Sequence, residues 1–363
     1  MKVALVQDWF VVNGGAEKVF RELVDMFPQA DVFSLVDFLD DRDRNDILNG
    51  KRSSTTWIQK IPLSEKIFRN FLVFFPHAIR SLDLSKYDLI ISSSYAVAKG
   101  IKKRKGQTHI CYCHSPIRYA WDLRKSYLGG LGPFKKLLAG WMLDHVAKWD
   151  LKTVHEVDFF IANSKNVSER ISRIYGRPST VIYPPVDTEG FSPESQKSDY
   201  YFTSLRVVPY KRLDLIVEAF RLMPDKKLVV SGDGPALPKI KNGAPSNVQF
   251  VGFVDKPKLV ELMQKAKAFI LAAEEDFGIT SLEAQACLTP VIALRKGGYL
   301  ETVVEDKTGV FFDEQTEDSL CSTINSFEFR KMSFESSDFL ENIKRYSTDR
   351  FRKEMQYFIN SHA

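Results

Sequence analysis

Short apolar runs alternate along this chain with stretches whose apolar residues have helical spacing. The predicted strands of the first half lie at residues 2–7, 32–35, 89–92, 108–113 and 159–162. Helical stretches lie between them, mainly at residues 16–27, 137–155 and 168–175. Strands that alternate with helices indicate an α/β protein with a parallel sheet covered on both faces.

A linker interrupts this alternation near the middle of the chain. Pro184 and Pro185 are adjacent, and the polar stretch 192–199 follows them. The pattern then resumes with strands at residues 200–204, 227–231, 248–250, 268–272 and 290–294 and helices at 213–222, 257–265 and 281–287. We therefore expect two Rossmann-like, doubly wound domains that face each other across a cleft, at residues 1–185 and 186–345, and a helical tail at 346–363.

Composition limits the class of protein. The 363 residues are 44% hydrophobic and 27% charged, which is typical of a soluble globular protein. No apolar run approaches the roughly 20 residues that a membrane span needs, and residues 1–7 suggest a buried strand rather than a signal peptide. Four cysteines suggest no disulfide framework, so we expect a cytoplasmic protein.

The net charge of +5 is unevenly distributed. Residues 1–180 hold 28 Lys and Arg against 19 Asp and Glu, a charge of +9, whereas residues 181–363 hold 23 against 27, a charge of −4. The basic first half is expected to face something anionic.

Two acidic residues, Glu275 and Glu283, lie eight positions apart around a predicted turn and helix start. Phe277 and Gly278 open the turn, and a glycine before a helix lets backbone N–H groups approach an anion that the helix dipole also favours. A ligand with phosphate and hydroxyl groups could be bound by both carboxylates and these amides. The alternative is a loop, a helix cap and two solvated acids.

A basic loop follows the predicted strand 200–204. Arg206 and Lys211 would project from it, and Lys211 would open the next helix. A diphosphate needs cations and backbone donors, and Arg supplies a planar fork where Lys supplies a point charge. An ordinary solvated basic loop is the alternative.

A cysteine- and histidine-containing segment ends the predicted strand 108–113. Cys111, Cys113 and His114 could bind a metal, but no second cluster accompanies them. His114 could also be a hydrogen-bonded core histidine, or it could border a reacting group. Near the N-terminus, Gly14 and Gly15 precede a helix, but they do not match the dinucleotide-binding pattern, so a nicotinamide enzyme is disfavoured.

These segments together resemble the retaining glycosyltransferases of family 4, which have the GT-B fold. The resemblance rests on the spacing of Glu275 and Glu283, on Arg206 and Lys211, and on the glycine-rich first loop, in the family's order. His114 and the aromatic segment 118–122 also resemble bacterial mannosyltransferases of lipopolysaccharide and capsule synthesis. The GT-B fold implies that the tail 346–363 packs back on the first domain.

The resemblance implies roles for individual residues. Catalytic roles fall to His114, Arg206, Lys211 and Glu275, and acceptor contacts to Asn13, Arg118, Tyr119 and Asp122. The implied donor-binding residues are Gly14, Gly15, Ser164, Arg206, Lys211, Gly232, Phe253, Val254, Glu275, Phe277, Gly278, Ile279 and Glu283.

The implied activity is the transfer of a hexose from a nucleotide-diphosphate sugar, with mannose from GDP-mannose preferred, to a lipid-linked or oligosaccharide acceptor of O-antigen or capsule synthesis. No metal or other cofactor is implied. A UDP- or dTDP-linked donor, a non-catalytic subunit that binds a sugar nucleotide, and a nucleotide-sugar epimerase are the alternatives.

Residues 51–80 carry six Lys and Arg among aromatic and aliphatic side chains, with Glu65 as the one acid. This composition suits an anionic membrane surface, on the inner face of the cytoplasmic membrane, but equally a helix with a core face and solvated charges. Nucleic acid is disfavoured because no groove-reading motif accompanies the charge.

Overall fold

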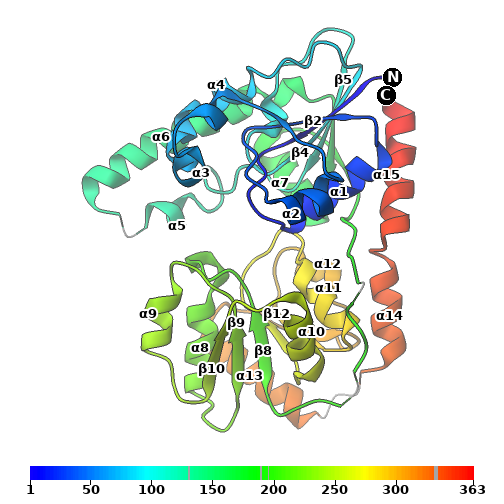
Figure 1. Ribbon diagram of the computed structural model, residues 1–363. Coiled ribbons are helices and arrows are strands. Elements are labelled where there is room, and N and C mark those ends of the chain that lie inside the picture. Colours follow the sequence, from blue (N-terminus) through cyan, green and yellow to red (C-terminus); the bar gives the residue numbers. More distant parts are fainter. Residues whose placement is uncertain (130, 189, 195, 331–333) are drawn as a thin grey trace. The chain divides into compact units, whose positions relative to one another are not determined.

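A computed structural model describes residues 1–129, 131–188, 190–194, 196–330 and 334–363 (Figure 1). The chain divides into two compact units. Unit 1 comprises Met1–Pro185 and Thr348–Ala363, and unit 2 comprises Val186–Ser347.

Unit 1 is built on a seven-stranded parallel sheet with the strand order β3-β2-β1-β4-β5-β6-β7. Its strands are β1 Val3–Gln7, β2 Asp31–Ser34, β3 Ser54–Thr55, β4 Leu89–Ser94, β5 Thr108–Cys113, β6 Phe159–Ala162 and β7 Ser179–Val181. The chain moves outward from β1 to β3 and then returns to the other side of β1 at β4. The topological switch point of this sheet therefore lies between β1 and β4.

Helices cover the sheet of unit 1. They are α1 Gly15–Met26, α2 Asp41–Leu48, η1 Trp57–Lys60, α3 Ser64–Ile67, η2 Phe68–Phe74, α4 Phe75–Ile79, η3 Ala98–Gly100, α5 Arg124–Leu128, α6 Pro133–Lys152, η4 Val154–Glu156, α7 Lys165–Tyr175 and α15 Thr348–His362. Helix α15 buries Phe351, Met355 and Ile359 in the same cluster as Leu5 and Leu23. The C-terminal helix thus belongs to the core of the first unit.

Unit 2 has a six-stranded parallel sheet with the order β10-β9-β8-β11-β12-β13. Its strands are β8 Tyr201–Ser204, β9 Leu228–Ser231, β10 Val248–Gly252, β11 Phe269–Leu271, β12 Val291–Leu294 and β13 Gly309–Phe312. Its helices are η5 Pro209–Lys211, α8 Leu213–Arg221, α9 Leu237–Asn242, α10 Lys256–Lys265, α11 Ile279–Ala286, α12 Tyr299–Thr302, α13 Glu317–Phe329 and α14 Ser336–Lys344. Here the switch point lies between β8 and β11.

Both sheets have apolar clusters on each face, as a sheet covered by helices on both sides requires. The predicted class, two Rossmann-like α/β domains, is therefore confirmed. The helix predicted at 137–155 has other bounds in the structure, because α6 begins at Pro133 and ends at Lys152. A proline is favourable in the first turn of a helix, where its missing N–H has no intrahelical partner.

Candidate active site

In unit 2, two predicted site residues meet at the switch point of the sheet. Lys211 follows β8 and Glu275 follows β11, and their side chains form an ion pair. Lys211 Nζ also lies 5.6 Å from the centre of the Tyr210 ring. Ligands of doubly wound sheets bind outside the carboxyl ends of the strands at this point, so the pair stands where a ligand site is expected.

The basic loop differs in detail from its prediction. Lys211 does not open helix α8 but ends the short 3₁₀ helix η5, and α8 begins at Leu213. Arg212 lies between them with φ 56°, a left-handed conformation that interrupts a helix. Arg206 lies exposed at the start of the same loop.

The turn before helix α11 needs a glycine. Gly278 has φ +92°, and a Cβ there would lie 2.6 Å from the ring of Tyr299. Ser281 Oγ donates to Gly278 O at 2.7 Å, and Phe277 packs its ring 5.5 Å from Tyr346. The turn therefore presents the first amides of α11, starting at Ile279, from a tightly packed base.

Glu283 lies within α11, and only 7% of its surface is exposed. The backbone of the preceding loop is joined to a second glycine turn, because Gly298 N–H donates to Glu275 O at 2.9 Å. A Cβ at Gly297 would lie 2.4 Å from the same oxygen. Only glycine allows this close approach, which holds the backbone of Glu275 in place.

The turn after β9 also contacts the basic loop. Gly232 has φ +127°, and a Cβ there would lie 1.9 Å from Leu205 O, next to Arg206. Phe253, after β10, is 85% exposed, and Val254 is half-buried. The four loops after β8, β9, β11 and β12 thus form one contiguous edge of unit 2 through these contacts.

In unit 1, the switch point is occupied by a carboxylate that the sequence analysis missed. Asp8 directly follows β1 and is fully buried. It accepts hydrogen bonds from the backbone N–H groups of Tyr95, Ala96, Val97 and Ala98, at 2.6–2.9 Å. Burial raises the pKa of Asp8 to about 6, although these four N–H groups act in the opposite direction. Asp8 therefore fixes the loop that follows β4.

His114 follows β5, beside that loop. Its Nε2 lies 2.8 Å from Ser93 Oγ, and its ring centre lies 6.2 Å from that of Tyr95 and 5.2 Å from that of Tyr112. Burial lowers the pKa of His114 to about 3, so the ring is neutral at pH 7. A neutral imidazole held by a hydroxyl can donate or accept one hydrogen bond at its other nitrogen.

The glycine-rich first loop surrounds a buried acid. Gly14 caps helix α1, Gly15 begins it, and the Gly14 N–H donates to Glu17 Oε2 at 3.2 Å. Burial raises the pKa of Glu17 to about 7. Asn13 is exposed and donates to Asp46 Oδ2 at 2.8 Å, so its amide contacts helix α2.

Residues 118–122, the predicted acceptor segment, are held at their C-terminal end by ion pairs. Asp122 pairs with Arg170 Nε at 2.5 Å, and Arg170 donates to Ser115 Oγ at 2.8 Å, so Arg170 joins the end of this segment to Ser115, which precedes its start. Arg118 and Tyr119 lie half-buried between them. The Tyr119 hydroxyl is buried and has no hydrogen-bond partner among the residues that the structure describes.

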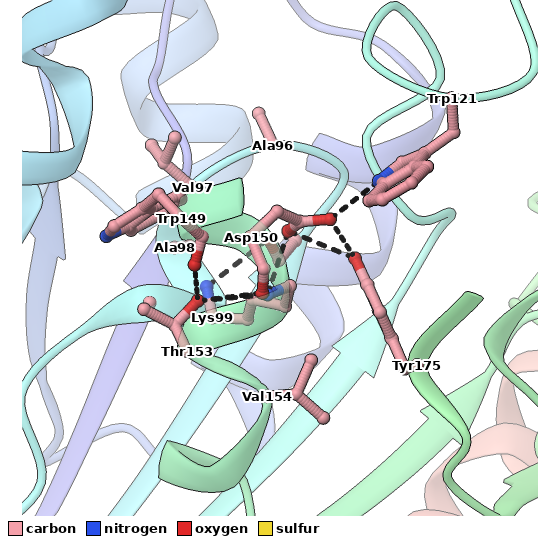
Figure 2. Close-up of polar contacts among 12 residues, drawn as sticks. Ala96, Val97, Ala98, Lys99, Trp121, Trp149, Asp150, Thr153, Val154 and Tyr175 are labelled. Carbon is pink, nitrogen blue, oxygen red and sulfur yellow. Dashed lines mark hydrogen bonds and ion pairs between the residues drawn. The ribbon is translucent and has the colours of Figure 1, made fainter. Parts of the chain in front are cut away.

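A buried ion pair is hydrogen-bonded to this segment through Trp121 (Figure 2). Lys99 Nζ lies 2.8 Å from Asp150 Oδ1, and both side chains are almost fully buried. Asp150 Oδ2 also accepts from Trp121 Nε1 at 2.8 Å and from the Tyr175 hydroxyl at 2.9 Å. This network connects η3, α6 and α7 to the acceptor segment, and no local sequence motif indicates it.

The remaining predicted residues of unit 1 are buried. Ser164 caps helix α7, and its Oγ accepts from Val167 N–H at 3.0 Å. Cys111 and Cys113 belong to an apolar cluster. Within the described part of the chain, no group of three His, Cys, Asp or Glu residues could hold a metal ion.

Residues 51–80 divide between core and surface. Ile58, Phe68 and Phe75 are buried, whereas Leu63 and Phe74 are exposed. Among the helices that the structure describes, none is both long enough and apolar enough to span a bilayer.

Two family models match the chain, one for each unit. Residues 13–190 match Glycosyltransferase Family 4, and residues 187–347 match Glycosyl transferases group 1. Together the two models span residues 13–347, and both describe glycosyl transferases.

Curated relatives also match part of the chain. The chain is 27% identical over 217 residues to the GDP-mannose-dependent alpha-(1-6)-phosphatidylinositol monomannoside mannosyltransferase of Mycolicibacterium smegmatis, covering 51% of this chain and 57% of the relative. It is 28% identical over 183 residues to the D-inositol 3-phosphate glycosyltransferase of Mycobacterium avium, covering 44% and 43%. The chain spans about half the length of these curated relatives.

Among solved structures, HepE of Anabaena in complex with UDP-glucose has a TM-score of 0.72 and 18% identity, covering 99% of this chain and 100% of HepE. At this identity the likeness shows the fold alone.

Proposed function

We propose that this protein is a retaining glycosyltransferase that moves a hexose from a nucleotide-diphosphate sugar to an acceptor hydroxyl. One observation carries the proposal: Lys211 and Glu275 form an ion pair at the switch point of unit 2. Two family models of glycosyl transferases also match the chain, over residues 13–190 and 187–347. A cation and a carboxylate at one ligand edge suit a donor that has both phosphates and hydroxyls.

The chemistry assigned to unit 2 is electrostatic. When the bond between the anomeric carbon and the diphosphate breaks, negative charge grows on the departing phosphate. Arg206, Lys211 and the amides at Phe277 and Gly278 would stabilise that charge, as donors of an oxyanion hole do. Glu275 would orient the sugar hydroxyls, and Glu283 the ribose.

The acceptor oxygen forms the new bond to the anomeric carbon on the face from which the phosphate leaves, and the phosphate takes the acceptor proton. His114 would border the reacting sugar, and its neutral ring could offer one hydrogen bond to a hydroxyl. The residues Asn13, Arg118, Tyr119 and Asp122 would contact the acceptor. This assignment of unit 1 rests on the resemblance of its loops to the family.

We further propose GDP-mannose as the donor. The mycobacterial relative is named as a GDP-mannose-dependent enzyme, and segment 118–122 resembles the corresponding segment of mannosyltransferases. The test is a donor screen read by mass spectrometry, with GDP-mannose, UDP-glucose and a dTDP-sugar, and NMR of the product's anomeric configuration. Turnover of UDP-glucose alone would overturn the mannose assignment, and an inverted product would overturn retention.

The acceptor we propose is lipid-linked or oligosaccharide material of cell-surface polysaccharide synthesis, handled by a cytoplasmic protein at the inner membrane face. The charge of +9 in residues 1–180 supports a contact with an anionic surface. Release of GDP from the donor only when a lipid-linked acceptor is present would support transfer. Donor binding without release would instead indicate a non-catalytic sugar-nucleotide-binding subunit.

A further inference from the structure

Helix α6 buries apolar residues along its second half and exposes them along its first half. Leu143 and Val146 are buried, with Ala147, in unit 1. In contrast, the exposed fractions are 79% for Phe134, 75% for Leu137, 51% for Leu138 and 59% for Trp141. These side chains have the size of core residues but lie in solvent.

The exposed residues form one stripe. Positions 134, 137, 138 and 141 repeat at three- and four-residue intervals and therefore share one side of a helix. The buried positions 143, 146, 147 and 150 have the same spacing, but at about 100° per residue they lie on the opposite side. The apolar side of the first half of α6 thus faces away from the core of unit 1.

The neighbouring segment extends this stripe. Tyr127, in α5, and Leu131 are also exposed, and Arg124 holds α5 against α6 through Asp144 at 2.8 Å and Gly140 O at 3.1 Å. Figure 1 shows α5 and the start of α6 at the left of unit 1, at the end opposite to helix α15. We call Tyr127, Leu131, Phe134, Leu137, Leu138 and Trp141 the α6 surface.

Asp122 and Asp144 flank the α6 surface and are paired with Arg170 and Arg124, and the charge between these two acids has one sign. Residues 123–143 contain Arg124, Lys125, Lys135 and Lys136 and no Asp or Glu. Lys125, Lys135 and Lys136 are exposed. On the helical projection, Lys135 and Lys136 lie away from the apolar stripe, which makes the first half of α6 amphipathic with a basic polar side.

We propose that the α6 surface docks on an anionic membrane, with its apolar stripe in the headgroup region and its lysines next to acidic lipids. Aromatic and aliphatic residues on one side of a helix and lysines on the other are the composition of an interfacial helix. The absence of acidic residues from 123–143 favours an anionic lipid surface over a second copy of this chain, whose matching surface would carry the same positive charge.

The same helix reaches the predicted acceptor segment. Asp150 accepts a hydrogen bond from Trp121, and it lies nine residues after Trp141, about 14 Å along the helix axis. A docked α6 would therefore hold the acceptor segment a short distance above the lipid surface. This part rests on the proposed function, and it favours acceptors whose sugar is attached to a membrane lipid.

The test measures co-sedimentation of the full chain with phosphatidylcholine vesicles that contain or lack phosphatidylglycerol. We expect pelleting with the anionic vesicles, and at least tenfold weaker binding for Phe134→Gln/Leu137→Gln/Trp141→Gln. The matched control, Leu222→Gln/Phe329→Gln, removes exposed apolar side chains from unit 2 and should bind normally. Circular dichroism and thermal unfolding verify that each variant is folded.

The charge is tested separately. Lys135→Gln/Lys136→Gln should weaken binding to anionic vesicles about thirtyfold, since each lysine near an acidic surface contributes about a factor of five to ten. Lys102→Gln/Lys105→Gln makes the same charge change at exposed positions elsewhere in unit 1 and should have little effect.

Two results would overturn the proposal: a wild-type chain that does not pellet, or a triple variant that pellets like wild type. If the wild type is a dimer that does not bind vesicles, and the triple variant is a monomer, the α6 surface is a self-interface instead. Transfer to a water-soluble acceptor separates the two proposals. If vesicle binding is as expected but no donor is turned over, docking stands and the transferase proposal fails.

Discussion

Lys211 and Glu275 are 64 positions apart in the sequence but form an ion pair that joins the loops after β8 and β11. The two side chains are 24% and 18% exposed, so a ligand can reach them. When no donor is bound, each of the two side chains restricts the conformational freedom of the other. The pair therefore holds a cation ready at the edge where a diphosphate would lie.

Removal of the Lys211 cation should affect catalysis far more than folding. We expect Lys211→Met to lower kcat by on the order of a hundredfold, the cost of a lost oxyanion donor. The free energy of unfolding should change by less than about 1 kcal/mol, because a partly exposed ion pair contributes little. Steady-state transfer and urea unfolding measure the two effects. Lys258→Met, which breaks the exposed pair with Glu261, is the control.

Arg206 tests whether a planar fork is needed at the diphosphate. Arg206→Ala should lower kcat/KM by on the order of a hundredfold, and Arg206→Lys should recover only part of that loss because an ammonium cannot bind two oxygens side by side. Arg221→Lys, on the exposed side of α8, should leave turnover unchanged. Full activity in Arg206→Ala would contradict the proposed diphosphate contact.

Loss of Asp150 should destabilise unit 1. In Asp150→Leu the Lys99 ammonium stays buried without its carboxylate, and such a loss costs roughly 3–5 kcal/mol. Lys99→Met/Asp150→Leu removes both charges, so we expect the double variant to be more stable than Asp150→Leu. Urea unfolding compares them, with Glu218→Leu as an exposed-pair control. Equal stability of the single and double variants would show that the buried charge is not the cause.

Much of the fold could be predicted from periodicity. The strands β1, β5 and β6 coincide with apolar runs that were predicted within one residue at each end. The sequence pattern predicts no strand at β3, β7 or β13, which have two to four residues, and β13 begins with Gly309, a residue that weakens a strand pattern. These strands form because a neighbouring strand supplies their hydrogen bonds, and a local pattern does not contain that information.

The residues of the candidate site likewise include some that the sequence predicts and some that it does not. Residues in recognisable local motifs, such as Glu275 before Gly278, could be found from spacing. Asp8 could not, because its partners at 95–98 are nearly 90 positions away and are backbone amides of unremarkable sequence. Lys99 and Asp150 are likewise an ordinary lysine and aspartate until the fold buries them together.

Gly232 provides a test of close packing at the basic loop. Gly232→Ala would place a Cβ 1.9 Å from Leu205 O at a φ of +127°, so the loop that carries Arg206 must move. We expect the free energy of unfolding to fall by at least about 1–3 kcal/mol from backbone strain. Donor affinity, measured by calorimetry, should fall as well.

The matched control for this test is Gly243→Ala. No atom lies within 4 Å of a Cβ at Gly243, and its φ is −102°. The change in stability should therefore stay within about 0.5 kcal/mol. If both alanine variants were equally stable, the close contact between Gly232 and Leu205 would be disproved.

His114 should make stability depend on acid pH. Burial lowers its pKa to about 3 in the folded protein, whereas an unfolded histidine titrates near 6.5. Below pH 6.5 the unfolded chain therefore binds a proton that the folded chain does not, and stability falls as the pH drops towards 3, by up to about 1.4 kcal/mol per pH unit. Between pH 6.5 and 5, wild type should lose up to about 2 kcal/mol relative to His114→Gln, which keeps a nitrogen near Ser93.

Urea unfolding at pH 7, 6 and 5 measures this difference between His114→Gln and wild type. His109 is also buried, and its pKa is lowered to about 4. It lowers the free energy of unfolding over the same pH range in both proteins, so its effect cancels in the difference. His77→Gln, at an exposed position of α4, controls for the loss of a histidine as such. A constant difference between His114→Gln and wild type over this range would mean that the pKa of His114 is the same in the folded and the unfolded chain, and the lowering of that pKa by burial would then be disproved.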